Sequence, residues 1–124
     1  MKKLYESGEM YLETILQLSH EKGQVRSIDI VHEMGFSKPS VSVAMKNLRE
    51  EQYVNVDEDG FITLTPSGRE IAEKIYERHT VLSEVLTLLG VDPSVAVEDA
   101  CKIEHDISDE SFNAIKEHLK AHRK

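Results

Sequence analysis

The 124-residue sequence predicts a mainly α-helical fold with one small β-hairpin. Most apolar residues recur at spacings of three and four, which is the period of an amphipathic helix. One short stretch instead alternates on both sides of the turn signal Asp57–Gly60, as in a β-hairpin. Proline, glycine and capping hydroxyl residues divide the helical pattern into separate helices. No segment approaches the roughly 18–20 apolar residues needed to span a bilayer, so no membrane partner is expected.

The first half of the sequence predicts helix-turn-helix geometry followed by the hairpin. Helices are expected from about residue 8 to 22, over 27–34 and from 38 towards 54, with the hairpin over 53–64. Ser27 and Ser37 are expected to cap the second and third helices, and Gly35 ends the second. A hairpin directly after the second helix of such a unit is a wing. Residues 1–66 therefore predict a winged helix-turn-helix DNA-binding domain; a generic helical domain with an incidental hairpin is the alternative.

The second half predicts an α-helical dimerisation domain over residues 67–124. Thr65-Pro66 begins a linker helix over about 66–89, and two further helices follow, one from Asp92-Pro93 to about Asp106 and one capped by Ser108. The linker helix carries more apolar residues than one stripe can bury against a thin monomer. A homodimer interface is therefore expected, and packing inside one chain is the alternative. The interface would combine the last two helices with Leu82, Val85, Leu86, Leu88 and Leu89.

The charge distribution indicates where DNA would bind. The net charge is −8, which argues weakly against nucleic acid, yet residues 34–49 contain three basic residues and no acidic one. Short hydroxyl side chains suit phosphate and water-mediated contacts, and Pro39 suits a thymine methyl group. The segment has no arginine placed to read guanine, so we expect recognition of the operator to rely on DNA shape. For Ser37, helix capping is the competing role. The expected contacts are Ser37, Lys38, Pro39, Ser40, Ser42 and Lys46.

A candidate metal site lies in the second half, in the pattern C-x-x-E-H. On a helix, Cys101, Glu104 and His105 would share one face, because residues three and four apart are neighbours. His79 interrupts the apolar stripe of the linker helix. Thiolate, imidazole and carboxylate ligands together suit a first-row transition ion and suit Mg²⁺ or Ca²⁺ poorly. A buried hydrogen-bonded pair is the alternative, since buried polar groups need partners of some kind.

Several motifs recur together in a known family. The runs E-M-Y-L-E, R-H-T-V-L, L-G-V-D and A-C-K-I-E-H-D-I-S-D-E occur here in order. With the winged helix, they make the whole chain resemble the iron-dependent repressor family (the diphtheria toxin repressor and manganese transport regulator type). The short two-domain form is expected, without the SH3-like domain. The resemblance implies a metal-dependent transcriptional repressor that binds operator DNA as a homodimer and controls metal-homeostasis genes.

The resemblance also implies a ligand set that mixes two types. Met10 and Cys101 match ligands of the iron type, whereas Glu13 matches a carboxylate of the manganese type. Val97 and Ser83 stand where an ancillary iron-type site would have His and Glu, so that site is not expected. A two-metal cluster bridged by Glu104 remains open. The soft ligands shift the preference away from Mn²⁺ and towards Fe²⁺, Co²⁺, Ni²⁺ or Zn²⁺. Because availability in the cell also decides, the expected metal is Fe²⁺ first and Mn²⁺ second, and Co²⁺, Ni²⁺ or Zn²⁺ can substitute. The full set is Met10, Glu13, His79, Cys101, Glu104 and His105.

Two other functions compete with this interpretation. One is a winged-helix regulator without metal dependence that senses redox state through Cys101. The other is a metalloenzyme, which is not expected because the sequence has no nucleophile motif, phosphate loop or H-E-x-x-H. A small organic substrate is not expected either.

One cysteine and the lack of an apolar run after the first lysines indicate a cytoplasmic protein. The remaining histidines, His20, His32, His118 and His122, are expected to be solvated rather than ligands.

Overall fold

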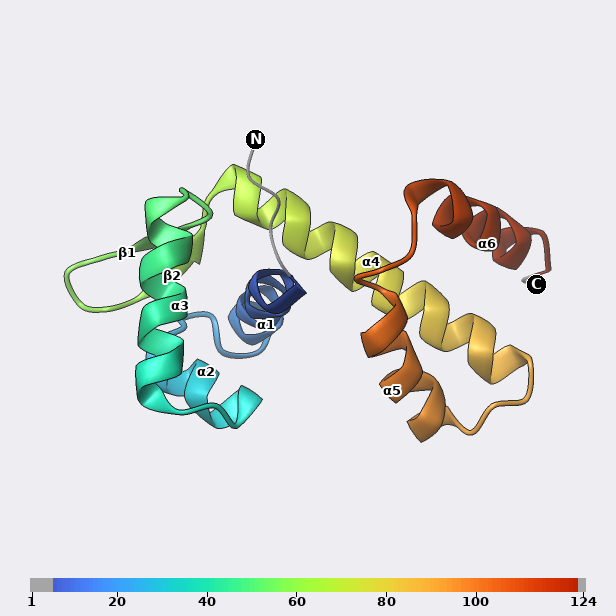
Figure 1. Cartoon of the computed structure of the whole chain (residues 1–124), viewed down its shortest axis with the longest axis horizontal. Coiled ribbons are helices and arrows are strands. Elements are labelled where there is room, and N and C mark those ends of the chain that lie inside the picture. Colours follow the sequence, from blue (N-terminus) through green and yellow to red (C-terminus); the bar gives the residue numbers. More distant parts are fainter. Residues whose placement is uncertain (1–5, 123–124) are drawn as a thin grey trace. The chain divides into compact units, whose positions relative to one another are not determined.

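A computed structural model describes residues 6–122 and divides the chain into two compact units, one up to Glu73 and one from Lys74 (Figure 1). The mainly α fold with a hairpin wing is confirmed. The predicted division at residue 66 stays a prediction, because a single helix runs on through both units. The elements are α1 (Glu6–Lys22), α2 (Ser27–Met34), α3 (Lys38–Glu50), β1 (Val54–Val56), β2 (Ile62–Leu64), α4 (Pro66–Leu88), α5 (Pro93–Ile103) and α6 (Asp109–His122).

The ends of α2 and α3 follow local hydrogen-bonding chemistry. Gly35 ends α2 in the left-handed conformation (φ 71°), and the Ser37 hydroxyl accepts the Ser40 N–H at 3.2 Å, both as predicted. The prediction that Ser27 caps α2 is wrong. The Asp29 carboxylate accepts the Arg26 N–H at 2.9 Å, so Arg26 is the cap and the helix already includes Ser27.

The third helix ends earlier than its apolar pattern indicates. We expected it to run towards residue 54, but α3 stops at Glu50. Gln52 then adopts a left-handed conformation (φ 66°), and the Tyr53 N–H donates back to the Leu48 carbonyl at 2.9 Å. This turn redirects the chain so that Val54 enters the hairpin directly.

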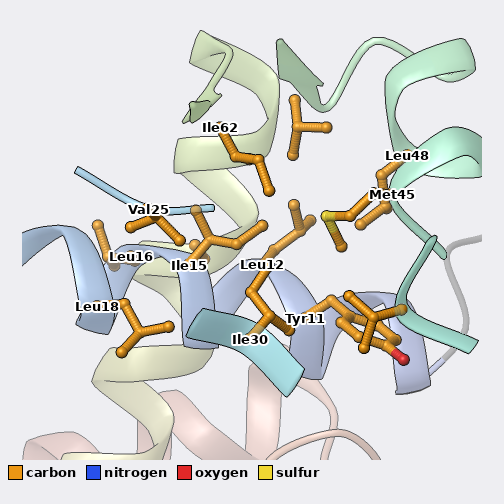
Figure 2. Close-up of a cluster of buried hydrophobic side chains, with 13 residues drawn as sticks. Tyr11, Leu12, Ile15, Leu16, Leu18, Val25, Ile30, Met45, Leu48 and Ile62 are labelled. Carbon is orange, nitrogen blue, oxygen red and sulfur yellow. The ribbon is translucent and has the colours of Figure 1, made fainter. Parts of the chain in front are cut away.

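The core of the first unit fixes α3 against α1, α2 and the hairpin (Figure 2). In the antiparallel hairpin Val54 pairs with Leu64 and Val56 with Ile62. The Ile62 N–H also donates to the Val25 carbonyl at 2.7 Å, which ties the wing to the segment before α2. The outer face of α3 is thereby left to solvent. The largest fully buried apolar side chains are Leu12, Ile15, Ile30, Val25, Val41 and Val54.

The second unit consists of the later part of α4 with α5 and α6. Val81 of α4 packs with Phe112 and Leu119 of α6, and the small residues Ala96 and Ala100 are the buried positions of α5. We expected α5 to continue to about Asp106, but it ends at Ile103. The N–H groups of residues 106 and 107 both turn back to the Ile103 carbonyl. Glu104 and His105 therefore lie in a turn.

The apolar residues at the end of α4 differ in how much surface they leave uncovered. Leu82 is buried within the chain, whereas Val85 and Leu86 are half-buried. Leu88 and Leu89 remain 67% and 76% exposed. Among these apolar residues, the exposed surface is thus greatest where α4 ends. Within residues 6–122, no helix combines the length and apolar character that crossing a membrane requires.

Candidate metal centre and DNA-binding surface

Three of the predicted ligands meet in the second unit. Nδ1 of His79 on α4 lies 3.0 Å from Oε2 of Glu104 and 3.7 Å from Sγ of Cys101 on α5. One ligand atom from each of the three residues falls within 4.8 Å of the other two. Cys101 and Glu104 are brought together by their spacing along the end of α5, and the packing of α4 adds His79. An ion placed among these atoms would receive nitrogen, sulfur and oxygen ligands.

Glu104 is the central residue of this cluster. Its carboxylate is only 1% exposed, and its second oxygen, Oε1, lies 3.4 Å from Nε2 of the equally buried His105. One imidazole thus faces each carboxylate oxygen. Burying a carboxylate is costly unless it is paired or binds a metal, so this arrangement requires positive charge or strong hydrogen-bond donors around Glu104.

The donor set fits a transition ion. Cys101 is exposed and His79 is half-buried, so an ion can reach the cluster from solvent. Imidazole and thiolate are ligands for Fe²⁺, Co²⁺, Ni²⁺ and Zn²⁺, whereas carboxylate also suits Mn²⁺. The His79–Glu104 distance is also that of a hydrogen bond. The two alternatives left by the sequence, an ion site and a hydrogen-bonded pair, therefore use the same atoms.

A buried arginine supports the turn that carries the ligands. Arg78 is 6% exposed, and its Nη1 donates to the carbonyl oxygens of Glu104 (3.1 Å) and Ile107 (2.7 Å). Its Nη2 pairs with the Asp109 carboxylate, and the guanidinium lies over the Phe112 ring. Sequence reasoning missed this residue. The only signal was an arginine at a position next to the apolar stripe of the linker helix.

The other two predicted ligands lie on α1 in the first unit. Met10 is partly exposed (36%) and Glu13 is half-buried, and a spacing of three places them on neighbouring turns of one face. Their part in metal binding stays a prediction that rests on the family resemblance. The two positions linked to an ancillary site hold an exposed Val97 and a half-buried Ser83, neither of which is a common metal ligand.

All six predicted DNA contacts are exposed and belong to α3 or its cap. They are Ser37, Lys38, Pro39, Ser40, Ser42 and Lys46. The Ser37 hydroxyl both accepts the Ser40 N–H and bonds the Ser40 hydroxyl at 2.9 Å, so its capping role is confirmed. Its contact with DNA stays a prediction.

The structure adds three residues to this surface that the predicted contact set omitted. Ser27, Val43 and Arg49 line a hollow of about 320 Å³ together with Ser42 and Lys46. Val43 is apolar and is 59% exposed, so it offers an apolar group on this surface. The amphipathic pattern of α3 had indicated only which residues face inwards.

The fold and the site together define a class of protein: a winged-helix transcriptional regulator with a second unit able to bind metal. Residues 3–61 match the family described as iron dependent repressor, N-terminal DNA binding domain, and residues 65–124 match iron dependent repressor, metal binding and dimerisation domain. The chain belongs to the iron-dependent repressor family. This family consists of transcriptional regulators and not of enzymes.

Curated relatives of this chain carry the name MntR. The HTH-type transcriptional regulator MntR of Listeria monocytogenes is 34% identical over 109 residues, which are 88% of this chain and 77% of the relative. The transcriptional regulator MntR of Salmonella typhimurium is 34% identical over 104 residues, which are 84% of this chain. The chain spans 66% of the length of that Salmonella protein.

Solved structures of the family share the fold. The manganese regulator SloR superposes with a TM-score of 0.80 at 27% identity, and covers 91% of this chain. A manganese-dependent transcriptional repressor in complex with manganese gives a TM-score of 0.83, also at 27% identity and 91% coverage. The chain spans only about half of these two proteins, 53% and 52% respectively.

Proposed function

We propose that this protein is a metal-dependent transcriptional repressor that binds operator DNA as a homodimer and controls genes of metal-ion homeostasis. The observation that carries the proposal is the convergence of His79, Cys101 and Glu104 in the unit that follows a winged helix. His105 faces the same carboxylate and is the fourth proposed ligand in this unit. The bound ion supplies the positive charge that the buried Glu104 requires.

The chain's own residues explain how metal and DNA binding can be coupled. Arg78 holds the backbone of the turn that carries Glu104, and the α4 helix that provides His79 begins directly after the wing. An ion that favours the DNA-binding conformation raises the affinity for DNA, and DNA must then raise the affinity for the ion by the same factor. Because the ligands bind in their deprotonated forms, metal affinity falls as the pH falls.

We propose Fe²⁺ as the first physiological metal and Mn²⁺ as the second. The thiolate of Cys101 supports a preference for Fe²⁺, Co²⁺, Ni²⁺ or Zn²⁺ over Mn²⁺. The description of the family names iron, and the solved structure of SloR is that of a manganese regulator. Cys101→Asp tests the role of sulfur: it should lower Co²⁺ affinity and abolish the thiolate-to-Co²⁺ absorption band, while Mn²⁺ affinity changes little. An unaltered Co²⁺ spectrum would remove Cys101 from the ligand set.

For DNA and dimer contacts, the proposal keeps the predicted residues. The exposed face of α3 enters the major groove, with Lys46 on phosphate and Pro39 beside a thymine methyl group. Val43 adds a second apolar group to that face. Among the apolar residues proposed for the homodimer, Leu89 leaves the most surface to cover, and Leu82, which is buried within the chain, leaves the least.

The test is DNA-binding anisotropy under anaerobic conditions, titrated with Fe²⁺, Mn²⁺, Co²⁺ and Zn²⁺ beside a chelator control. Binding should require metal, and His79→Ala should abolish the response. His32→Ala is the matched control, because His32 is an exposed histidine on α2 outside the cluster. Operator binding that is equally tight with chelator would contradict the proposal. The rival regulator that senses redox state through Cys101 is not favoured, since the relatives are metal-dependent regulators.

A further inference from the structure

The last helix carries two histidines one turn apart on an exposed face. His118 and His122 are both exposed on α6, at a spacing that makes them neighbours on a helix. Their ring centroids lie 4.1 Å apart and the ring planes differ by 32°. The two imidazoles therefore lie side by side, close enough for one ion to bind both.

A hydrogen bond fixes the chemical form of one of these rings. Nδ1 of His122 lies 2.9 Å from the carbonyl oxygen of His118. A carbonyl oxygen only accepts, so Nδ1 must donate, and in the neutral ring the lone pair is then on Nε2. Histidines that bind metals commonly donate their other ring N–H to such an acceptor, which fixes the tautomer and strengthens the ligand. His122 thus has its metal-binding nitrogen available.

One of the positive charges near the pair is partly offset. Lys120 lies between the two histidines in the sequence, and its Nζ is 3.9 Å from the carboxylate of Glu117. A cation approaching this face therefore meets a lysine whose charge is partly offset. Water can complete the coordination, as it does at metal sites with an open position.

We propose that His118 and His122 form a second, solvent-exposed metal site, specific for Ni²⁺, Cu²⁺ or Zn²⁺ and separate from the cluster around Glu104. Two imidazoles without a carboxylate or thiolate suit these late transition ions, and Mn²⁺ binds such ligands most weakly. This proposal departs from the expectation that both histidines are solvated residues and not ligands. The Glu104 cluster also offers ligands for Ni²⁺ and Zn²⁺, whereas Mn²⁺ would bind at that cluster and not on α6.

The experiment uses the full chain carrying Cys101→Ala, which removes the thiolate of the first cluster, with Ni²⁺ as the probe. Paramagnetic broadening of the histidine ring NMR signals is followed as Ni²⁺ is added. The signals of His118 and His122 should broaden together, at a lower Ni²⁺ concentration than the signals of the exposed His20 and His32. His118→Ala should weaken Ni²⁺ binding at this site by about 100-fold, the usual gain from a second linked ligand, and should leave Mn²⁺ binding unchanged.

The matched control is His20→Ala, on an exposed face of α1. Leu16 and Gln24 occupy the positions four residues before and after His20, so no second imidazole can join it in the same helical register. This variant should bind Ni²⁺ at α6 as before. The proposal is overturned if His118→Ala keeps full Ni²⁺ affinity, or if His20 broadens at the same Ni²⁺ concentration as the pair. Because all three histidines are exposed, thermal melting without metal should be unchanged in each variant and rules out misfolding.

Discussion

The guanidinium of Arg78 donates a hydrogen bond to the carbonyl oxygen of Glu104, while the imidazole of the adjacent His79 contacts the carboxylate of the same residue. Two consecutive residues of α4 thus hold the backbone and the side chain of one glutamate. The orientation of the proposed central ligand depends on how α4 packs against the turn after α5. A change in that packing would alter the metal site directly.

Replacing Arg78 should destabilise the second unit and weaken metal binding together. Arg78→Met removes a buried cation and leaves the carbonyl oxygens of Glu104 and Ile107 without their donor. A buried polar group left without its hydrogen-bond partner costs about 1–3 kcal/mol, so we expect a loss of at least that order in the free energy of unfolding, measured with urea. Arg78→Lys keeps the charge but not the forked geometry, and should fold with reduced metal affinity.

The control for this prediction is Lys74→Met. Lys74 lies 3.0 Å from the Asp109 carboxylate, which also pairs with Arg78, but Lys74 is exposed. An exposed ion pair contributes about 0–1 kcal/mol, so this change should be nearly neutral. Equal losses in the two methionine variants would mean that burial of Arg78 has no special importance.

Asp29 predicts a pH-dependent contribution to the stability of the first unit. The backbone N–H of Arg26, and then the Lys22 ammonium at 3.0 Å, hold the pKa of Asp29 below its usual value. A carboxyl with a lowered folded pKa stabilises the protein above its unfolded pKa, about 3.9, and loses this effect as the pH falls through the folded value. Asp29→Ala should therefore cost about 1 kcal/mol at pH 7 and progressively less below about pH 4.

Urea unfolding of wild type and Asp29→Ala at several pH values measures this difference. Glu33→Ala, an exposed change on the same helix, serves as the comparison. A destabilisation by Asp29→Ala that is constant from pH 7 down to about pH 3 would show that the carboxylate charge is not responsible.

Features with local causes could be predicted from the sequence, whereas features that depend on distant residues could not. Helix existence, the wing and most caps follow from spacing and from local groups such as Ser37, because their causes lie within a few residues of each other. The ends of α3 and α5 were extended too far, since each is set by a turn that the apolar pattern does not record. Spacing placed Cys101 near Glu104. The hydrogen bonds from Arg78 to Glu104 and Asp109 were not predictable, because they join residues 26 and 31 positions apart in the sequence.

Gly68 should not tolerate a side chain although it lies in a helix. A Cβ added at this position would meet the carbonyl oxygen of Tyr53 at 2.0 Å, so the start of α4 or the turn before β1 would have to move. Alanine in place of glycine ordinarily stabilises a helix by about 1 kcal/mol. Here Gly68→Ala should instead destabilise the first unit by about 1–3 kcal/mol in thermal or urea unfolding.

Ser67→Ala provides the comparison for Gly68, because Ser67 is the exposed neighbour in the same helical turn. It should change the free energy of unfolding by no more than about 0.5 kcal/mol. If Gly68→Ala were as stable as wild type, the close approach of α4 to Tyr53 would have to be wrong.

Lys46 tests whether the exposed face of α3 is the DNA-binding surface. Lys46 lies on that face beside the hollow lined by Ser42 and Arg49, in a segment without acidic residues. A lysine on phosphate contributes through counterion release, which is independent of base sequence. Lys46→Ala should therefore weaken binding to operator and to unrelated DNA alike, and should reduce the slope of log affinity against log salt by about 1.

The control is Lys102→Ala, which removes the same charge from an exposed position on α5, outside the first unit, and should leave that slope unchanged. Equal slopes in wild type and Lys46→Ala would exclude Lys46 from the phosphate contacts, and a loss confined to the operator would instead assign it to reading the bases.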